Sequence, residues 1–547
     1  MLDAAVIIAG GGPCGLVLAN ELGRRGIATL LLNDRPTTSP HPQANATQAR
    51  TMEHYRRLGF VRRIRQLGLP SDYPTDVTYF TRFTKHEIAR FELPAAGPAE
   101  DLVKQLSGSW SAAELPHRCS QMYIEKILYD EAQRLPSVDL RFGWKLVDFA
   151  EAGDHVEVEA VNAAGDRKKF TGAYLVGCEG PRTEVRRKLG YAMRGEAGKV
   201  RPFLGGRMHA LYFRAPGLYA ILPHRKSWQY WAVNCERRGT MAALDGAEEF
   251  VFMTQIRPTE DAENITDAQA REMFALCLGR PFEIELLARS NWTAGLTLVA
   301  EKFSHGRVFM AGDAVHLFTP TGGLGYNTAV EDAVNLGWKL AAVLNGWGGP
   351  DLLASYEPER EPVARRNTGF ARGFADSIGN LVPPPTIEEE SPAGEAARAE
   401  VGAYLNRHAR EEFNIPGVTF GARYDGSPII VSDGTTPPPD AANVYRPTAC
   451  PGGRAPHAWL ADGRSLYDTL GFDFTVLRLG RAPDVAPLVA AAKARGMPLA
   501  VTENSSEELR DLYAADLALI RPDQIVAWRG NRLPDDPASL LARVTGH

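Results

Sequence analysis

The chain has 547 residues, of which 44% are hydrophobic and 23% are charged, so it is long enough for two to four separately packed domains. A net charge of -5 and a pI near 6.2 exclude the strongly basic surface typical of nucleic-acid-binding proteins. No apolar run is long enough to cross a bilayer, and the six cysteines stand singly, without the spacing of a zinc site. We therefore expect a cytoplasmic protein without metal, nucleic acid or membrane as a partner.

The first predicted element is a buried strand at residues 5–9, followed at once by the glycine-rich turn GGGPCG. Gly10, Gly12 and Gly15 occupy the three positions of GxGxxG, and a helical pattern and a second strand at residues 28–32 follow. Gly10 permits the tight turn, Gly12 lets a pyrophosphate approach the backbone, and Gly15 lets the helix pack on the strand. A chance glycine turn is the alternative, but the flanking elements favour a dinucleotide site.

The end of the second predicted strand departs from the usual pattern of such sites. A carboxylate that accepts hydrogen bonds from the adenosine ribose is expected there, but the chain has Asn33 followed by Asp34. An amide oxygen accepts such a bond more weakly than a carboxylate does. Two alternatives stay open, because either Asn33 makes this contact or Asp34 replaces it.

A second nucleotide-binding pattern lies at residues 308–327, where a strand leads through Gly312 and Asp313 into a glycine-rich loop. Asp313 is placed to accept hydrogen bonds from ribityl hydroxyls. The loop at residues 320–327 can lie against a flat ring, and the amides of the helix expected near Thr328 would stabilise negative charge on that ring. The alternative interpretation is that this segment binds no ligand and is an acidic turn followed by a glycine-rich linker.

These segments resemble the flavin-dependent aromatic hydroxylases, the family of para-hydroxybenzoate hydroxylase and of the phenol and polyketide hydroxylases. The likeness is carried by the N-terminal turn, by SQMYIEKIL from Ser120, by residues 174–186 and by GDAVHLFTPTGGLGYN from Gly312. It implies noncovalently bound FAD, with NADPH or NADH as a transient electron donor. The expected cofactor-binding residues are Gly10, Gly12, Pro13, Gly15, Asn33, Asp34, Gln43, Arg50, Gln121, Glu179, Gly180, Asp313, Pro320, Gly323, Leu324, Gly325, Tyr326 and Asn327.

Two of these positions depart from the family pattern. Relatives commonly have an arginine where Gln43 stands, and a neutral amide cannot neutralise a pyrophosphate. Arg50 is the candidate to compensate, and a surface arginine is the ordinary alternative. Relatives also carry Asp-Gly where this chain has Glu179 and Gly180, and the longer glutamate bears on nicotinamide binding.

The resemblance implies an α/β protein with three parts: a Rossmann-like FAD-binding domain of the para-hydroxybenzoate hydroxylase type, an inserted antiparallel substrate-binding sheet and a thioredoxin-like C-terminal α/β domain. The expected boundaries are 1–186 and 287–380 for the FAD-binding domain, with 76–115 contributing in part to the substrate sheet, 187–286 for that sheet, 381–440 for a helical or loop connector and 441–547 for the C-terminal domain. Alternating apolar residues predict sheet strands at 208–213, 218–222, 228–233 and 250–256. The last cysteine is Cys450, so the C-terminal domain has no dithiol for disulfide exchange.

The activity that the resemblance implies is hydroxylation of a phenolic or other electron-rich aromatic substrate by NAD(P)H and oxygen, through a flavin C4a-hydroperoxide. The partners are then a small aromatic molecule and oxygen, and a homodimer is left open. A flavin-dependent reductase or dehydrogenase and a catalytically degenerate FAD-binding protein are the alternatives.

A base or hydrogen-bond relay is expected near the substrate hydroxyl. The catalytic candidates on the predicted sheet are His209, Tyr212 and Tyr230, although packing explains each of them as well. Asn45 stands where some phenol hydroxylases have an aspartate base, and His316 is equally well explained as structural. Four aromatic residues either line a pocket for a ring or fill a core, namely Trp228, Trp231, Phe213 and Phe318.

Overall fold

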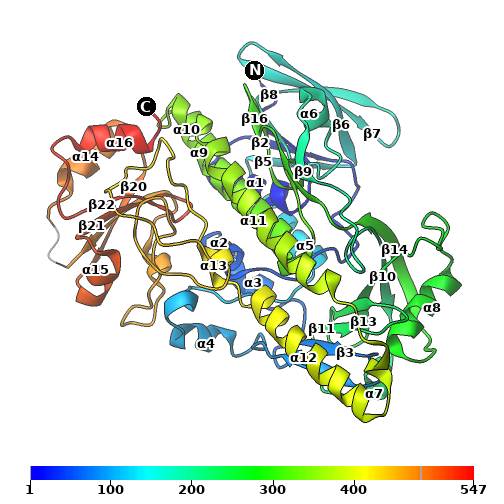
Figure 1. The fold of residues 1–547 in the computed structure, drawn as a ribbon. Helices are drawn as coiled ribbons and strands as arrows, with labels where there is room; N and C mark the ends of the chain where they lie inside the picture. Colours follow the sequence, from blue (N-terminus) through cyan, green and yellow to red (C-terminus); the bar gives the residue numbers. More distant parts are fainter. Residues whose placement is uncertain (1, 481–482) are drawn as a thin grey trace.

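The computed structural model describes residues 2–480 and 483–547. Its largest sheet has eight strands, and its main path runs β16-β17-β8-β1-β2-β5, with β7 on β8 and β6 on β7 (Figure 1). The strands from β17 to β5 pair in parallel, as expected for a nucleotide-binding sheet. The eight strands are β1 (Ala4–Ala9), β2 (Thr29–Asn33), β5 (Val138–Phe142), β6 (Trp144–Ala152), β7 (His155–Asn162), β8 (Arg167–Gly177), β16 (Ser304–His305) and β17 (Val308–Met310).

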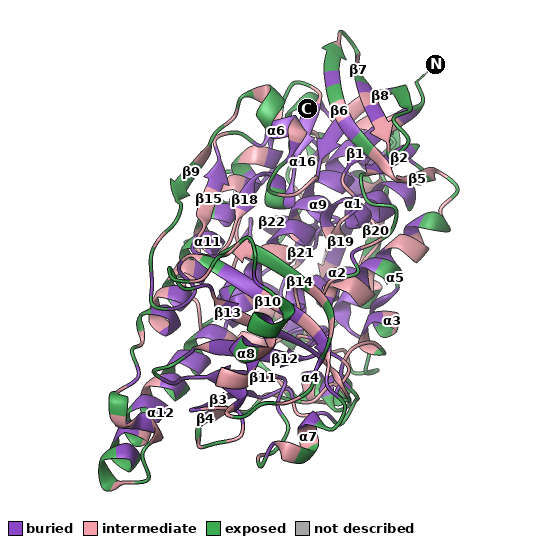
Figure 2. Ribbon diagram, turned by 90° about the vertical axis from the view of Figure 1, so that its right-hand side faces the viewer, coloured by how far each residue is buried: buried purple, intermediate pink, exposed green. Residues whose placement is uncertain are grey.

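Two helices that follow the predicted nucleotide motifs pack against each other behind this sheet. α1 (Pro13–Gly23) begins directly after Gly12, and α9 (Leu324–Leu344) begins four residues before the expected start near Thr328. Most residues of both helices are buried, which Figure 2 shows as purple ribbon at the centre of the molecule. Other helices of this region are α2 (Ala49–Arg57), α3 (Val61–Arg65), α5 (Gln121–Gln133), α6 (Glu184–Leu189), α10 (Pro350–Ala354) and α11 (Tyr356–Asn380).

A second sheet of seven strands lies beside the first, in the order β14-β10-β13-β12-β11-β3-β4. Its pairings are antiparallel except that β11 pairs in parallel with β3, which comes with β4 from an earlier part of the chain. The strands are β3 (Val77–Phe80), β4 (Glu87–Phe91), β10 (Arg207–Arg214), β11 (Gln229–Ala232), β12 (Gly239–Ala243), β13 (Glu249–Gln255) and β14 (Glu285–Thr293). Helices near this sheet are α7 (Leu218–Ile221), α8 (Asp267–Leu278) and α12 (Pro392–Phe413). α4 (Ala99–Gln105) packs in a separate cluster with Phe420 and Tyr445.

One predicted strand of this sheet was wrong. Residues 218–222 do not form a strand, because α7 (Leu218–Ile221) occupies most of this segment. Gly217 precedes it with a φ of 79°, a left-handed conformation that turns the chain out of the strand direction. β12 was not predicted, because its sequence GTMAA has Met241 as its one large apolar residue and so shows no clear alternation.

A three-stranded sheet joins the two larger sheets. β15 (Thr297–Ala300) pairs on one side with β9 (Met193–Glu196) and on the other with β18 (His316–Leu317). The chain thus leaves and re-enters the nucleotide-binding part through paired strands, and α11 packs against them.

The C-terminal domain has the thioredoxin-like topology that the sequence predicted. Its strands lie in the order β20-β19-β21-β22, with β19 and β20 parallel and the other two pairings antiparallel. The elements are β19 (Phe474–Leu479), α14 (Ala486–Ala494), β20 (Leu499–Asn504), α15 (Glu507–Tyr513), β21 (Leu517–Ile520), β22 (Val526–Gly530) and α16 (Pro537–Val544), with α13 (Pro416–Phe420) before them. Figure 1 shows this domain in orange and red, on the opposite side of α9 from the seven-stranded sheet. Among the described helices, none is long and apolar enough to cross a membrane.

Candidate active site

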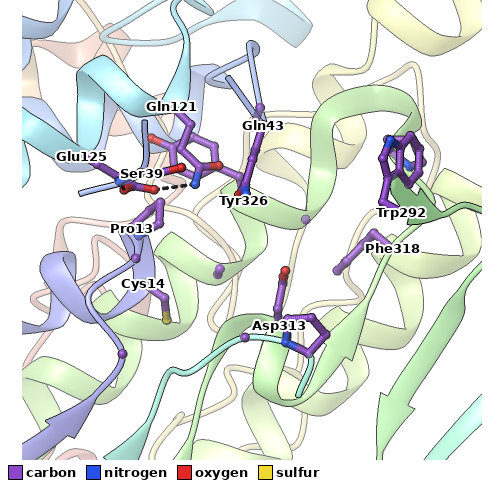
Figure 3. A pocket seen from close by; sticks show the side chains of 18 of the residues that line it. Pro13, Cys14, Ser39, Gln43, Gln121, Glu125, Trp292, Asp313, Phe318 and Tyr326 are labelled. Atoms are coloured by element: carbon purple, nitrogen blue, oxygen red, sulfur yellow. Dashed lines mark hydrogen bonds between the residues drawn. The ribbon is translucent and has the colours of Figure 1, made fainter. Parts of the chain in front are cut away.

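A cavity of about 1110 Å³ lies between the eight-stranded and seven-stranded sheets, and Figure 3 shows it from close by. Its wall combines the glycine turn after β1, the loop before α9 and side chains of β11 to β14. Pockets for a single small ligand usually measure roughly 300–1,000 Å³. The cavity is therefore large enough for more than one bound molecule.

The glycine turn after β1 forms one end of the cavity. A side chain is excluded at Gly10, which has a φ of 108° and where a Cβ would lie 2.3 Å from the carbonyl oxygen of Cys178. At Gly15 a Cβ would lie 1.9 Å from the carbonyl oxygen of Gly10, so helix and strand approach closely there. Among the residues that the structure describes, none lies close to the Cβ position of Gly12 and no side chain caps the amides at the start of α1. The turn therefore presents free backbone donors to the cavity.

Asn33 and Asp34, at the end of β2, both line the cavity but differ in their contacts. The Oδ1 atom of Asn33 accepts a hydrogen bond from the Gly11 amide at 3.0 Å, so it holds the glycine turn in place. Asp34 is exposed. The Asn33 oxygen therefore already accepts one hydrogen bond, whereas the exposed Asp34 carboxylate remains available to a ligand in the cavity.

Gln121, at the start of α5, fixes the loop that carries Gln43. The side chain of Gln121 donates to Glu125 at 2.6 Å, and Glu125 also accepts a hydrogen bond from the Ser39 amide at 2.8 Å (Figure 3). The backbone amide of Gln121 donates to the carbonyl of Ala44 at 2.7 Å. Burial raises the pKa of Glu125 above its ordinary value. Gln121 and Gln43 are held at the cavity wall by these contacts.

The turn at Asp313 is held from behind by Asp332 of α9. Asp332 accepts hydrogen bonds from the Gly312 amide at 3.1 Å and from His316 at 2.7 Å, and it pairs with Arg360 at 2.7 Å. Asp313 is left free to face the cavity, where the surrounding protein raises the pKa of its carboxyl. His316 is buried behind the turn, so its role is structural.

The glycine loop before α9 is likewise fixed by polar contacts. Gly322 and Gly323 have φ values of 69° and 63°, which other residues rarely adopt. The Gly322 amide donates to Glu412 of α12 at 2.9 Å, and Asn327 donates to the carbonyl of Gly323 at 2.6 Å. The backbone of this loop therefore has a set position at the cavity wall before any ligand binds.

The other end of the cavity is aromatic. Trp228, Trp231, Trp292, Phe318 and Phe413 line it, and Trp228 and Phe413 meet edge-to-face with ring centres 6.2 Å apart. Figure 3 draws Trp292 and Phe318 on the side of the cavity away from Gln121. Sequence reasoning missed several residues here, because strand register and helix packing bring them to the wall: Arg118, Leu204, Gln229, Thr240, Met253, Trp292, Glu412 and Phe413.

Most of the predicted cofactor-binding residues line this cavity. Those that do are Gly10, Gly12, Pro13, Asn33, Asp34, Gln43, Gln121, Glu179, Gly180, Asp313, Pro320, Gly323, Leu324, Gly325 and Tyr326. Gly15 and Asn327 lie just behind the wall and support it through the contacts described above. Asn45, at the position of a family base, also lines it.

The prediction for Arg50 was wrong. Its guanidinium is buried and donates to Glu53 at 2.9 Å and to Gln524 and the Asp523 carbonyl, both at 2.6 Å. These partners include the C-terminal domain, which the sequence could not place next to α2. Arg50 therefore fastens the two domains together and is not available to a pyrophosphate.

The three catalytic candidates are also not part of the cavity wall. Tyr230 lies between Gln229 and Trp231, which line the cavity, so it points to the opposite face of the sheet. His209 pairs with Thr254, the neighbour of the lining residue Met253, and therefore points to that opposite face too. There the Nδ1 atom of His209 lies 2.6 Å from the side-chain oxygen of Asn291, and the Tyr230 hydroxyl accepts a hydrogen bond from the Ser227 amide at 2.8 Å. Tyr212 donates to Glu249 at 2.7 Å, away from the cavity. Phe213 fills the core of the same sheet.

Comparison with known proteins identifies the family. The profile of the family described as "FAD binding domain" matches residues 3–371, and the profile described as "Aromatic-ring hydroxylase, C-terminal" matches residues 448–547. The chain belongs to the FAD-dependent aromatic-ring hydroxylases. The hydroxylase is similar to the FAD-dependent monooxygenase apdD of Emericella nidulans, at 29% identity over 99% of this chain and 90% of the relative. It is also 30% identical to a putative polyketide hydroxylase of Streptomyces halstedii, over 96% of this chain and 93% of that protein.

Solved structures extend the likeness to the whole hydroxylase. The rebeccamycin biosynthetic enzyme RebC with bound 7-carboxy-K252c superposes with a TM-score of 0.89 at 33% identity, over 100% of this chain and 99% of that one. Aklavinone-11 hydroxylase in complex with FAD and aklavinone has a TM-score of 0.82 at 26% identity, over the full length of both chains. The hydroxylase is therefore an FAD-dependent monooxygenase, which favours the main interpretation over a reductase or a degenerate FAD-binding protein.

Proposed function

We propose that this monooxygenase hydroxylates a flat, polycyclic aromatic substrate. The observation that carries the proposal is the two-ended cavity of about 1110 Å³, with backbone donors at one end and five large aromatic side chains at the other. Stacking and edge contacts with three tryptophans suit a broad π-system better than a single phenol ring. Among relatives, polyketide hydroxylases and a structure with bound aklavinone support this size class, whereas phenol 2-monooxygenase of Pseudomonas represents the smaller one.

The reaction that we propose converts an aromatic C–H to C–OH, with the second oxygen atom leaving as water and two electrons coming from NADPH or NADH. FAD, when bound, supplies the reduction and activation of oxygen. The protein positions the two molecules and keeps water away from the reacting centre. Trp292, Phe318 and Phe413 serve the last purpose, since they close the aromatic end with apolar surface.

We assign the parts of FAD to the two motifs by their chemistry. The free amides at Gly12 and the start of α1 suit the pyrophosphate. Asp34 suits the adenosine ribose, because the Asn33 oxygen already holds the turn. Asp313 and the fixed loop at Gly323 suit the ribityl chain and the ring.

We keep the predicted division into domains and move one boundary. Residues 77–91 supply β3 and β4 to the seven-stranded sheet, which supports their assignment to the substrate-binding part. β14 continues that sheet to Thr293, so we place the second boundary after this residue.

Anaerobic stopped-flow reduction tests the proposal. The FAD-loaded protein is mixed with NADPH or NADH, alone and with phenol, 2-naphthol or 2-hydroxyanthraquinone. We expect the larger ring systems to accelerate flavin bleaching and the turnover product to carry oxygen from ¹⁸O₂. If phenol alone accelerated flavin bleaching, the proposal of a polycyclic substrate would be contradicted. A reduced product without ¹⁸O would favour the reductase interpretation instead.

A further inference from the structure

Arg118 is a buried cation at the wall of the cavity. It lies three residues before Gln121, only 8% of it is exposed, and its guanidinium carbon lies 4.3 Å from the ring centre of Trp228. Within residues 2–480 and 483–547, no acceptor receives a hydrogen bond from its side chain and no carboxylate pairs with it. Other buried arginines differ, since Arg360 pairs with Asp332 and Arg521 pairs with Glu359.

A buried charge without a partner is costly, and proteins keep one where a ligand supplies the partner. Burial alone lowers the pKa of Arg118 to about 10, so the side chain stays protonated at neutral pH. Water in the open cavity can solvate it. A ring system that fills the cavity displaces this water and leaves the cation unpaired unless it brings an acceptor of its own.

The position of Arg118 separates it from the glycine turn that suits the pyrophosphate. Its stacking partner Trp228 precedes β11 in the seven-stranded sheet and contacts Phe413, so Arg118 belongs to the aromatic end. The guanidinium carbon lies over the ring of Trp228, and a guanidinium that packs on a ring keeps its N–H edge available to a ligand. That edge matches two oxygens of a carboxylate.

We propose that Arg118 binds a carboxylate on the aromatic substrate, so that the enzyme prefers aromatic acids over neutral ring systems of the same size. This inference rests on the proposed function, because it names a further property of the same substrate. It assigns Arg118 the selection of substrate and no part in the reaction with oxygen.

The test compares each acid with its own neutral amide, so that ring size and shape stay the same. Benzoic acid, 2-naphthoic acid and anthracene-2-carboxylic acid are titrated into the FAD-loaded protein beside their primary amides, and binding is followed by the change in flavin absorbance. We expect at least one acid to bind about 30-fold or more tightly than its amide, the range for a desolvated charge pair. Arg118→Met should abolish this preference, and Arg118→Lys should keep part of it.

Arg182→Met is the matched control, since Arg182 also lines the cavity but is exposed. It should leave the acid preference unchanged. Equal binding of acid and amide at every ring size, or an acid preference that survives Arg118→Met, would overturn the proposal. A loss of FAD affinity in Arg118→Met without any change in acid preference would overturn it too, and would reassign the residue to the cofactor. Binding needs no turnover, so a failure of the hydroxylation itself would be seen separately, in the ¹⁸O experiment.

Discussion

Arg521 of the C-terminal domain forms a two-point ion pair with Glu359 of α11, at 2.7 and 2.9 Å, and neither side chain is exposed. Lys339 of α9 also pairs with Glu359, at 2.7 Å. Removing one partner of such a buried pair leaves the other charge without compensation. The C-terminal domain therefore completes the charge balance of the helices that support the cavity.

This relationship predicts a large loss of stability on substitution. Arg521→Met should lower the free energy of unfolding by about 3 kcal/mol. The control is Arg464→Met in the same domain, whose pair with Asp462 is exposed and screened by water, so its loss should change the stability little. Urea unfolding of both variants measures the difference. Equal effects would show that the interdomain pair adds nothing beyond an ordinary surface contact.

The two glycines of the N-terminal turn should respond differently to alanine. In Gly12→Ala the new Cβ meets no atom of residues 2–480 and 483–547 within 4 Å, so the fold should persist while the methyl group obstructs the pyrophosphate site. We expect FAD to bind at least about tenfold more weakly, a change of about 1.4 kcal/mol. Gly15→Ala should instead unfold more easily, because its Cβ would collide with the Gly10 carbonyl. Flavin fluorescence titration and thermal unfolding of the apoprotein separate the two effects, and an unchanged FAD affinity in Gly12→Ala would contradict the assignment.

The contacts of Asp332 lead us to predict that a substitution in the core of α9 changes the affinity for FAD. Asp332→Asn would weaken the pair with Arg360 and loosen the turn at Gly312, with a stability loss of about 3 kcal/mol and weaker FAD binding. The neighbouring substitution Glu331→Gln affects a partly exposed pair with the same arginine, at 3.2 Å, and should leave FAD binding unchanged. If both variants bind FAD like the original protein, the turn does not depend on Asp332.

The environment of Glu179 leads us to predict that the free energy of unfolding depends on pH. Burial, opposed in part by a hydrogen bond from Thr183, raises the pKa of Glu179 to about 6. The folded state thus holds this proton more tightly than the unfolded chain, so the stability present at low pH is lost as the pH rises through about 6. Glu179→Gln removes the titration, and its advantage over the original protein should grow between pH 4.5 and 7. Urea unfolding across this range, with the exposed Glu400→Gln as control, would reject the idea if the two variants show the same pH profile.

Local sequence predicted the nucleotide motifs because their chemistry is contained within short segments. Gly10, Gly12 and Asp313 each act through the few residues around them. The residues at the aromatic end depend on strand register instead, and alternation alone does not say which face of a strand meets the cavity. The alternation therefore could not say that His209 and Tyr230 lie on the face away from the cavity.

Contacts between distant segments explain the other differences. Arg50 meets Gln524 of the C-terminal domain, which no local pattern near either residue indicates. Arg118 and Trp228 are likewise neighbours only in the folded chain. In a sequence, a buried arginine with a partner looks the same as a buried arginine without one. Only the structure distinguishes the two.

The two halves of the flavin site, around Gly12 and around Gly323, are separated by about three hundred residues of chain that must be made and folded between them. During translation, the segment around Gly12 emerges from the ribosome long before the segment around Gly323. Until then the nascent chain offers free flavin only one half of its binding site. Cofactor loading then becomes a late step of biogenesis. Expression hosts with little free FAD would be expected to accumulate a folded but colourless protein, which added flavin could restore after purification.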